Sequence, residues 1–457
     1  MRSARNTRNA LIAGNRAPNR HRNLEIAYHS IDQLTLDPLN PRLHSKKQLK
    51  QIARSIEVFG FNVPVIIDAK SRVIAGHGRI SACKLLGLTE VPTIRLEHLT
   101  EQQVRAFVIA DNKLTENAAW DERLLAQQFQ ELSSVDLNFH LEDTGFEMGE
   151  IDLLIEGLAP MTEGETDPAD DIPASGSAVS IPGDLWMLGP HRIYCGSALD
   201  AASYQNLMPD QKARMVITDP PYNVRIQGHA SGLGRVQHKD FVMASGEMTE
   251  IQFTFFLTQT CLQLTNNSVD GSIHFIFMDW RHQGELLAAG RQAYTELKNV
   301  CVWVKDNAGM GSLFRSQHEF CFVFKNGHAP HQNHIQLGEF GRYRTNIWNY
   351  PGVNSFSRST GEGNLLALHP TVKPVALIAD AIMDCSSRGD IILDAFLGSG
   401  TAVLAAERTG RICFGIDLDP TYVDTSVRRW QAYTGQIARH AQTNKSFSTL
   451  ELERAQS

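Results

Sequence analysis

The sequence lacks the cysteine patterns that stabilise secreted proteins or bind structural zinc. Its seven cysteines are scattered along the chain, and none belongs to a Cys-x-x-Cys pair. An odd, scattered set does not indicate a disulfide framework. The histidines also lack the spacing of metal ligands, so we expect no metal site.

Long hydrophobic runs are missing as well. No apolar run is long enough to cross a bilayer, and the N-terminus, rich in Arg and Asn, lacks the apolar core of a signal peptide. We therefore expect a cytoplasmic protein without a membrane partner. With 457 residues, of which 42% are hydrophobic and 20% charged, the chain has an ordinary globular composition and is long enough for more than one domain.

Positive charge is absent from one long interval. Between Arg123 and Arg192 there is no lysine or arginine, while fourteen aspartates and glutamates fall there. The formal net charge of the chain is −7, so the residues outside this interval carry +7. A basic remainder is compatible with contacts to DNA phosphates. Residues 1–24 contribute six arginines and no acid, and their low apolar content predicts a disordered basic tail.

Changes in composition and periodicity divide the rest of the chain. Residues 25–120 are typical of a small α+β domain, 121–160 of a helical extension, and 161–182 of a flexible acidic linker. Residues 183–435 predict a larger α/β domain, followed by a C-terminal tail over 436–457. Periodicity predicts helices over 46–58, 80–86, 99–117, 124–132, 151–158 and 249–264, and strands over 63–68, 72–75, 185–188, 191–195, 273–278, 300–305 and 319–324. Two pairs of these strands, 63–68 with 72–75 and 185–188 with 191–195, are each expected to form a hairpin.

An acidic, doubly prolyl stretch is the first candidate site. The apolar run Met215–Ile217 leads directly into Thr218-Asp219-Pro220-Pro221-Tyr222-Asn223. β-Branched residues stopped by prolines indicate a buried strand that ends in a rigid loop, at the edge where open α/β sheets bind ligands. A carboxylate, free carbonyls and a ring suit a flat base with an exocyclic amino group, because oxygens accept its hydrogens while the ring stacks on it. An ordinary Pro-Pro loop is the alternative.

A glycine-rich stretch is the second candidate site. A strand beginning near Asp390 leads into Asp394-Ala395-Phe396-Leu397-Gly398-Ser399-Gly400-Thr401 and then into a helical pattern. Glycines allow a ligand to approach the backbone, and a helix N-terminus offers N–H groups. The next strand ends at Asp417, roughly 20 residues after the glycines, which is a typical spacing for a carboxylate that holds ribose hydroxyls.

Together the two stretches resemble the amino-group DNA methyltransferases, which use S-adenosylmethionine. Asp219-Pro220-Pro221-Tyr222 matches their catalytic motif and precedes the cofactor loop, as in the β class of that family. His369-Pro370-Thr371-Val372-Lys373-Pro374 resembles the segment of that class that lies against the methionine part of the cofactor. The resemblance covers about residues 183–435 and implies a doubly wound methyltransferase sheet. Ser197 is a departure, because the family usually has an acidic residue there that contacts the adenine of the cofactor.

The resemblance also implies roles for individual residues. Adenine N6 in a flipped-out base of double-stranded DNA is the expected methyl acceptor, because the family's cytosine-N4 enzymes more often have Ser in place of Asp219; cytosine N4 is the alternative. Target recognition is expected within residues 225–365, where Arg342, Tyr343, Arg344 and Trp348 are candidates. The expected catalytic residues are Asp219, Pro220, Pro221 and Tyr222, and the expected cofactor-binding residues are Asp394, Ala395, Phe396, Gly398, Ser399, Gly400, Thr401, Asp417, Thr371 and Lys373.

The N-terminal domain has a resemblance of its own. Asn40-Pro41-Arg42, a strand pair, and the turn formed by Gly76, His77, Gly78 and Arg79 before a helix resemble the N-terminal domain of the ParB-like partition proteins, a fold shared with sulfiredoxin. In that family the turn faces nucleotide phosphates, so a nucleotide is implied as a further partner. A capped structural turn and an added contact with DNA are the alternatives for His77 and Arg79.

A protein of another class is also compatible with this sequence. It would be a nonenzymatic ParB-like DNA-binding or partition factor with a relic methyltransferase half. A relic would be expected to lose acceptors or glycines, whereas Asp219, Tyr222, Gly398, Gly400 and Asp417 are all present. The oligomeric state stays open, with a dimer among the alternatives.

Overall fold

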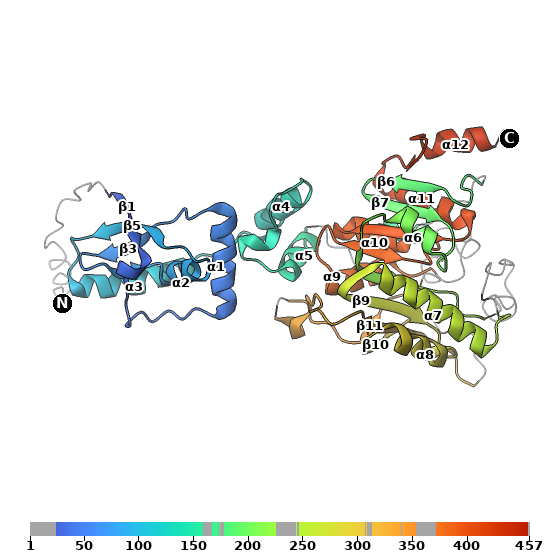
Figure 1. Cartoon of the computed structure of the whole chain (residues 1–457), viewed down its shortest axis with the longest axis horizontal. Helices are drawn as coiled ribbons and strands as arrows, with labels where there is room; N and C mark the ends of the chain where they lie inside the picture. The colour runs from blue at the N-terminus through green and yellow to red at the C-terminus, as the bar shows by residue number, and fades with distance from the viewer. Residues whose placement is uncertain are drawn as a thin grey trace, which may run out of the picture. The chain divides into compact units, whose positions relative to one another are not determined.

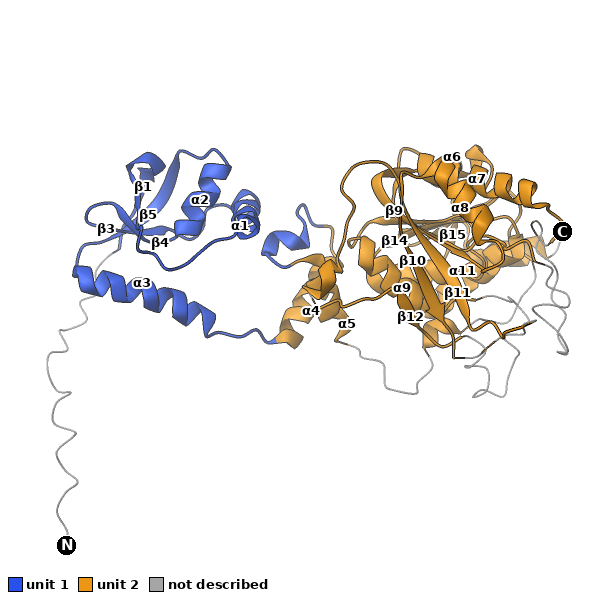
Figure 2. Cartoon of the chain, turned by 90° about the horizontal axis from the view of Figure 1, so that it is seen from below, with its two compact units in different colours: residues 1–121, 137–146 blue, residues 122–136, 147–457 orange. Residues whose placement is uncertain are grey.

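The computed structural model describes residues 24–158, 167–171, 173, 178–224, 244, 246–306, 308, 313–339, 341–352 and 372–455. The predicted basic tail and the candidate cofactor residue Thr371 lie outside these ranges. The chain forms two compact units, distinguished by colour in Figure 2: residues 1–121 with 137–146, and residues 122–136 with 147–457. No helix within the described ranges has the length and apolar character of a membrane span.

The first unit is the expected α+β domain, built on a five-stranded sheet of order β1-β5-β3-β4-β2. Strands β3 and β4 form the predicted antiparallel hairpin, and β3 pairs in parallel with β5. The elements are β1 Ile26–Ser30, η1 Ile31–Gln33, β2 Thr35–Leu36, α1 Lys46–Phe59, β3 Val65–Asp68, β4 Arg72–Ala75, α2 His77–Leu85, β5 Glu90–Leu96, α3 Glu101–Glu116 and η2 Leu141–Thr144.

Neighbouring apolar residues on β4 face opposite sides of this sheet. Val73 belongs to a core cluster that includes Ile80 and Cys83 of α2, whereas Ile74 packs with Val104 and Val108 of α3. This alternation is the period of two expected for a strand buried on both sides. Cys83 is therefore a core residue of the domain.

The second unit contains a ten-stranded sheet of order β12-β10-β11-β9-β8-β13-β14-β7-β6-β15. Its central strands β9, β8, β13, β14 and β7 run parallel to one another, and antiparallel strands flank them. The predicted hairpin of β6 and β7 is confirmed. The strands are β6 Leu185–Leu188, β7 His191–Cys195, β8 Ala213–Thr218, β9 Ser268–Met278, β10 Glu296–Val304, β11 His318–Lys325, β12 Ile347–Asn349, β13 Ile391–Asp394, β14 Ile412–Asp417 and β15 Arg439–His440.

Helices cover both faces of this sheet, as in a doubly wound fold. Met215 and Ile217 of β8 pack into one core cluster and Val216 into the other, so the strand is buried on both sides. The first cluster contains residues of α9 and α10, and the second contains residues of α7 and α8, which lie side by side in Figure 1. The helices are α4 Glu122–Ser133, α5 Met148–Glu156, α6 Ala201–Leu207, α7 Glu250–Asn266, α8 Gln283–Ala293, α9 Val375–Cys385, α10 Thr401–Thr409, α11 Pro420–Thr434 and α12 Phe447–Arg454, with short 3-10 turns η3 Pro168–Asp170 and η4 Gln336–Gly338.

The prediction of a C-terminal tail over 436–457 is wrong for the described residues. Strand β15 pairs with β6, and α12 packs against the sheet through Phe447, whose ring lies 5.1 Å from that of Trp186. Phe447 and Leu450 are both buried. The two apolar side chains, together with the ion pair of Arg454 with Asp184 at 2.6 Å, attach this short helix to the second unit, although they give a weak signal in the sequence.

The prediction of a flexible acidic linker over 161–182 is also wrong where the structure describes the segment. Ala169 is buried in the core of the second unit, and Asp167 pairs with Arg408 at 2.6 Å. Asp170 accepts the backbone N–H of Val375 at 2.8 Å. Acidic side chains suggested a solvated segment, but these two carboxylates bind donors that are distant in sequence.

Two stretches of the predicted helical extension, residues 122–136 and 147–158, are likewise part of the second unit, whereas residues 137–146 belong to the first. Asp152 of α5 is fully buried and accepts hydrogen bonds from Arg411 at 2.9 and 2.8 Å and from Arg388 at 3.1 Å. Arg411 is itself buried and begins the turn into β14. Because a buried charge is costly without a partner, this ion pair fixes α5 to the sheet.

Candidate active site

The two candidate motifs lie at the carboxyl ends of neighbouring strands. β8 pairs in parallel with β13, and β13 with β14. Asp219 follows β8, whereas Asp394 and Asp417 end β13 and β14. The hydroxyl of Thr218 donates to Asp394 Oδ1 at 2.7 Å and joins the first two strand ends. The structure therefore brings the acidic loop and the glycine loop to one edge of the sheet.

Two buried carboxylates form the base of the glycine loop. Asp394 Oδ1 also accepts the N–H of Phe396 at 3.1 Å, and Asp417 accepts the N–H groups of Gly398 at 2.7 Å and Asp419 at 2.9 Å. Burial raises the pKa of Asp394 and of Asp417 to about 7. With backbone and hydroxyl donors around them, these groups are acceptors suited to the hydroxyl and amino donors of a nucleoside.

The glycines serve the geometry of the loop. Gly398 and Gly400 have φ of 54° and 82°, in the left-handed region that favours glycine, and Gly400 is the N-cap of α10. A Cβ on Gly400 would lie 2.7 Å from the hydroxyl oxygen of Ser426 on α11. The expectation that this glycine makes room for a ligand is thus corrected, because the missing Cβ faces a packed helix.

Arg429 supports the same loop from the protein interior. Its Nη1 donates to the carbonyl oxygen of Ser399 at 3.1 Å and to the hydroxyls of Ser399 and Thr401 at 3.2 Å each. Thr401 in turn donates to the carbonyl oxygen of Lys373 at 3.3 Å. The two hydroxyls therefore connect the loop to the segment that carries Lys373.

A charged cluster surrounds Asp219 at the end of β8. The phenol of Tyr222 donates to Asp219 Oδ1, and the ammonium of Lys373 pairs with Asp219 Oδ2. Lys373 is buried, with 5% of its side chain exposed, so the pairing takes place largely out of water. Pro220 is buried, and Pro221 lies between the two polar residues in a half-buried position.

Glu319 is a second carboxylate in this cluster that the sequence analysis did not identify. Its Oε2 lies 3.1 Å from Lys373 Nζ and 3.1 Å from the phenol oxygen of Tyr222, while its Oε1 pairs with Lys305. Glu319 is 8% exposed. A signal was present in the sequence, because Glu319 is the acidic residue of the otherwise apolar run in β11.

The charges of the cluster stabilise one another. Burial disfavours charge on all of these groups, but the two lysines outweigh it for Glu319 and lower its pKa to about 2. Burial raises the pKa of Asp219, an effect to which Glu319 adds and which Lys373 opposes. The carboxylates likewise outweigh burial for Lys373 and raise its pKa, so this lysine stays charged. Burial and both carboxylates raise the pKa of Tyr222, so its phenol stays neutral.

Asn223 fixes the end of the acidic loop. It has a φ of 52°, and its side-chain oxygen accepts the N–H groups of Gly246 at 3.0 Å and Met248 at 3.2 Å. Its amide nitrogen donates to the carbonyl oxygen of Met248 at 2.8 Å. Asn tolerates the left-handed conformation better than most residues. The loop is therefore attached to the segment that begins α7.

The prediction that Arg342, Arg344 and Trp348 read base edges is wrong. Arg342 is buried and pairs with Asp384 at 2.9 Å and Asp380 at 3.2 Å, and Arg344 binds the same two carboxylates at 3.2 and 3.1 Å. Trp348 is buried on β12. These side chains attach the segment before β12 to α9. Of the four candidates, Tyr343 is exposed, at 80%.

The ParB-like turn makes contacts within its own unit. Gly76, with a φ of 105°, is the N-cap of α2, so the helix begins three residues earlier than the predicted Ile80. Arg79 donates to the carbonyl oxygens of Val63 and, at 3.0 Å, Pro64. The ring nitrogen Nε2 of His77 accepts the N–H of Asp37 at 3.3 Å.

Comparisons with known proteins cover most of the chain. Three family models match: a ParB N-terminal domain over residues 15–113, a ParB-methyltransferase HTH domain over 123–182, and a DNA methylase over 213–428. The HTH match spans both the segment predicted as a helical extension and the one predicted as a linker.

Individual proteins resemble the two parts separately. Over 80 residues the chain is 42% identical to the ParB-like nuclease domain-containing protein YnaK of Escherichia coli (strain K12), covering 18% of this chain and 92% of YnaK. Over 256 residues it is 25% identical to the Type II methyltransferase M2.MboI of Moraxella bovis, covering 53% of this chain and 88% of that enzyme. The PvuII DNA methyltransferase (cytosine-N4-specific) is a solved structure with 15% identity and a TM-score of 0.41, covering 57% of this chain and 90% of its own.

The doubly wound sheet, with an acidic loop and a glycine loop at neighbouring strand ends, defines an S-adenosylmethionine-dependent methyltransferase. The chain belongs to the N6/N4 family of DNA methyltransferases and carries a ParB N-terminal domain and a ParB-methyltransferase HTH domain ahead of its catalytic part. The described residues fit the cofactor, because the buried carboxylate of Asp417 ends β14 beside the positive-φ glycine loop and the N-terminus of α10.

Proposed function

We propose that this protein transfers a methyl group from S-adenosylmethionine to N6 of adenine in a base flipped out of double-stranded DNA. The observation that carries the proposal is the position of Asp219, at the end of β8 and one strand away from the glycine loop. An aspartate as the first residue of this motif favours adenine over cytosine, since the cytosine-N4 enzymes more often have serine there.

Each residue around Asp219 has its own role in the proposed reaction. S-adenosylmethionine, when bound, supplies a methyl group on a sulfonium, which is already activated toward an amine. The carboxylate of Asp219 and the carbonyl of Pro220 accept the hydrogens of the amine, which localises the lone pair of its nitrogen. Pro221 keeps this loop rigid, and the ring of Tyr222 stacks on the flipped base.

For the cofactor we propose a site on the glycine loop. Asp417 accepts from the ribose hydroxyls, as a carboxylate at this spacing typically does. The backbone of Asp394, Ala395, Phe396 and Gly398 forms the surface of the loop, while Ser399, Gly400 and Thr401 hold its shape through Ser426 and Arg429. Lys373 contacts both the cofactor loop, through Thr401, and the cluster around Asp219. Thr371, two residues earlier in the sequence, stays a predicted cofactor-binding residue.

Analysis of the methylated nucleosides tests the proposal. The full-length protein is incubated with labelled S-adenosylmethionine and duplex DNA, and the product is digested to nucleosides and separated by chromatography with mass detection. We expect label in N6-methyladenine. Label in N4-methylcytosine alone would contradict the choice of base, and absence of label in any DNA would support the nonenzymatic ParB-like factor instead.

For the N-terminal unit we propose contacts with DNA in preference to a nucleotide. The guanidinium of Arg79 is bound to two backbone carbonyls, and His77 to a backbone N–H, so both side chains have partners within the unit. Titration of the full-length protein with CTP and ATP, and separately with duplex DNA, distinguishes the two partners. Tight nucleotide binding would contradict this proposal.

A further inference from the structure

We propose that Glu319 is a positioning residue, which accepts the hydrogen bonds that Tyr222 and Lys373 now donate to Asp219. The Asp219 carboxylate is then free to accept the amine hydrogens of the target base. The inference rests on the proposed amine methylation, but it does not depend on which base is methylated. Glu319 belongs neither to the motif Asp219–Tyr222 nor to the glycine loop. It lies on β11, 100 residues after Asp219 and 75 residues before Asp394.

Both oxygens of Asp219 already accept hydrogen bonds. Tyr222 donates to Oδ1, and Lys373 pairs with Oδ2. The hydrogens of an incoming amine would compete with a phenol and with a full positive charge. A charge-assisted bond is roughly twice as strong as a neutral one, so an amine alone would not displace Lys373.

Both donors have the same alternative acceptor within reach. Glu319 Oε2 lies 3.1 Å from Lys373 Nζ and 3.1 Å from the phenol oxygen of Tyr222. A small rotation of each side chain therefore moves its hydrogen from Asp219 to Glu319. Such a movement also releases the ring of Tyr222 to stack on the base.

The alternative acceptor is required because the cluster is buried. Breaking a buried ion pair by removing one partner is strongly destabilising, since a charge is left without compensation. Lys373 is 5% exposed and could not leave Asp219 for water without this cost. With Glu319 in place, the ammonium keeps a carboxylate partner throughout.

Lys305 completes the arrangement by keeping Glu319 ionised. It pairs with Glu319 Oε1, on the side away from Lys373 and Tyr222. The charges of the two carboxylates and the two ammonium groups therefore balance both before and after the hydrogen bonds move to Glu319. Among the described residues, the charged or titratable groups that face Asp219 are Tyr222 on its own loop, Glu319 and Cys321 of β11, Lys373 before α9, and Asp394 of β13, with Lys305 behind Glu319.

Kinetics of the Glu319→Gln variant test the proposal, in the full-length protein with duplex DNA and S-adenosylmethionine. Glutamine keeps the volume but cannot compensate an ammonium. We expect kcat to fall by about 10²-fold, with the affinities for cofactor and DNA within a few fold of the wild type. We also expect the acidic limb of the pH profile of kcat to move to lower pH, because the charge of Glu319 contributes to the raised pKa of Asp219.

Two further variants separate positioning from stability. Glu319→Asp keeps the charge and is expected to recover at least about tenfold of the lost kcat. Glu407→Gln removes the partner of His191 and Trp430, away from the cluster, and is expected to leave kcat and its pH profile unchanged. If Glu319→Gln does not fold, a wild-type kcat in Lys305→Met, which removes the charge that keeps Glu319 ionised, would overturn the proposal.

The outcomes also separate this inference from the proposed function. A wild-type protein that methylates no amine in DNA would refute the function itself. A wild-type protein that does so, while Glu319→Gln keeps kcat and the acidic limb unchanged, would refute only the role of Glu319. An equal loss of kcat in Glu319→Gln and Glu319→Asp with an unmoved acidic limb would likewise show that the residue acts through packing alone.

Discussion

At the scale of single residues, the active site depends on the exchange of a few protons and hydrogen bonds. Asp219 shares its carboxylate between a phenol and an ammonium, and burial raises its pKa. A carboxylate is too weak a base to deprotonate a neutral aromatic amine before attack, so we assign it the orientation of the amine. We propose that it then accepts the proton that the methylated nitrogen releases, as an N–H bond breaks and an O–H bond forms.

Asp219→Ala should separate chemistry from cofactor binding. Removing the acceptor should lower kcat by at least about 10²–10³-fold. The affinity for S-adenosylmethionine should change by less than a few fold, because Glu319 remains as the partner of Lys373. Isothermal titration with the cofactor and single-turnover kinetics measure the two quantities. A comparable loss of cofactor affinity would contradict the division of the site.

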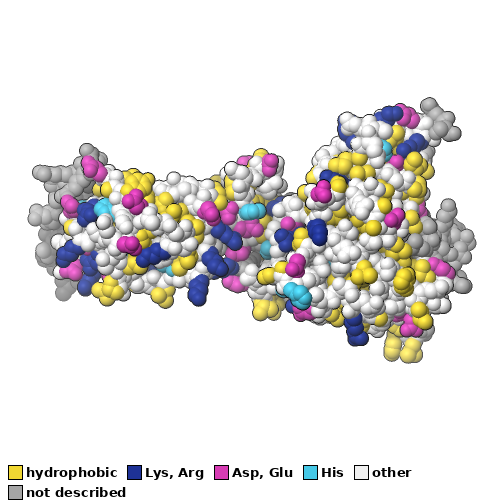
Figure 3. Space-filling model, in the orientation of Figure 1, with side chains coloured by type: hydrophobic (Ala, Val, Ile, Leu, Met, Phe, Trp, Pro, Cys, Tyr) yellow, Lys and Arg dark blue, Asp and Glu magenta, His cyan; other side chains and the backbone are white. Residues whose placement is uncertain are grey.

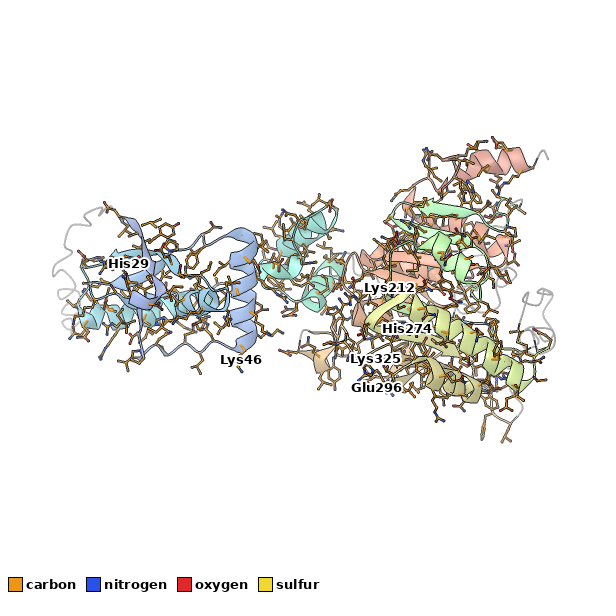
Figure 4. The ribbon with its side chains drawn as sticks, in the orientation of Figure 1. His29, Lys46, Lys212, His274, Glu296 and Lys325 are labelled. Atoms are coloured by element: carbon orange, nitrogen blue, oxygen red, sulfur yellow. The ribbon has the colours of Figure 1, made fainter. Side chains whose placement is uncertain are left out.

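His274 on β9 should make the stability of the second unit depend on pH. It is buried, its ring nitrogens lie 3.0 Å from the Ser272 and Tyr294 hydroxyls, and burial lowers its pKa to about 3 (Figure 4). Its unfolded pKa is about 6.5, so the unfolded state binds more protons between these values. The contribution of His274 to the free energy of unfolding should therefore rise from pH 3 to about 6.5, by up to about 1.4 kcal/mol per pH unit, and stay level above. Asp394 and Asp417, whose pKa values are raised, contribute with the opposite sign, so only a comparison with a His274 variant isolates this effect.

Urea unfolding between pH 4 and 8 measures this effect in the wild type and in His274→Gln. In His274→Gln, the slope of the free energy of unfolding against pH should be smaller on the acidic side, by the amount that corresponds to about one bound proton. His328→Gln, which removes an exposed histidine of the same unit, is the matched control. Equal slopes in the wild type and His274→Gln would show that His274 does not contribute.

At the scale of elements, the carboxyl ends of β8, β13 and β14 form the site, and the helices behind them set its shape. The segment Asp167–Asp171, which precedes the strands of this sheet in the sequence, contacts two of these helices. Asp170 accepts the N–H of Val375 at the start of α9, and Arg429 donates to the carbonyl oxygen of Ala169 at 2.7 Å as well as to Ser399. Part of the HTH match therefore contacts groups that position both Lys373 and the cofactor loop.

Alanine substitutions in the glycine loop should distinguish backbone strain from packing. Gly398→Ala and Gly400→Ala both place a Cβ at positive φ, at a cost of roughly 1 kcal/mol, and Gly400→Ala also meets Ser426. Gly389→Ala is the matched control, because it has a φ of 81° and no atom within 4 Å of the added Cβ.

We expect all three glycine variants to lose thermal stability, most of all Gly400→Ala, whereas only the two loop variants should bind S-adenosylmethionine more weakly. Differential scanning calorimetry and titration with the cofactor measure these effects. Equal stability of Gly389→Ala and Gly400→Ala would show that contact with α11 does not require the glycine. An equal loss of cofactor affinity in Gly389→Ala would show that the effect is not local to the loop.

At the scale of the whole molecule, the chain passes between its two units more than once. It leaves the first unit at residue 121, returns for residues 137–146 and leaves again at 147. Residues 137–146 belong to the first unit through contacts with α1, such as that between the rings of Phe139 and Phe59 at 5.3 Å. A single flexible tether, as the composition suggested, does not describe this connection.

The surface charges are mixed on the side that Figure 3 shows. Lys and Arg side chains alternate there with Asp and Glu on both units, among the residues that the structure describes. The basic remainder inferred from the sequence is thus not gathered in one patch on this face. Any contacts that this face makes with DNA phosphates should consequently come from several separate positions, each adding to the salt dependence of binding.

Truncation should show where the catalytic part begins. A protein starting at Ser180 lacks Asp152 and Asp170, and leaves Arg411 and Arg388 without a carboxylate partner, at a cost of about 3–5 kcal/mol for a broken buried pair. A protein starting at Glu122 keeps these contacts. We expect the longer protein to be folded and to methylate the same sequence, and the shorter one to be unstable or insoluble.

Thermal unfolding and methylation assays of the two truncated proteins measure this difference. A protein starting at Ser180 with the melting temperature of the longer one would show that the segment before it is dispensable. A change of target sequence in the longer protein would show that the ParB-like unit takes part in recognition.

Features that depend only on neighbouring residues could be predicted from the sequence. A β-branched run stopped by two prolines, and a strand followed by glycines and a helix, are local patterns, so the order of the two motifs and the strand ends that carry them could be predicted. The helix over Lys46–Phe59 and the hairpins of β3 with β4 and β6 with β7 were predictable for the same reason.

Which charged side chains are buried, and which partners they have, depends on how distant parts of the chain pack together. Glu319 meets Lys373, Arg342 meets Asp384 and Asp152 meets Arg411 across 54, 42 and 259 residues. In the sequence each is a polar residue of the kind usually found in solvent. The free energy of a buried charge depends on where its partner lies, and that position is set by the packing of distant strands and helices.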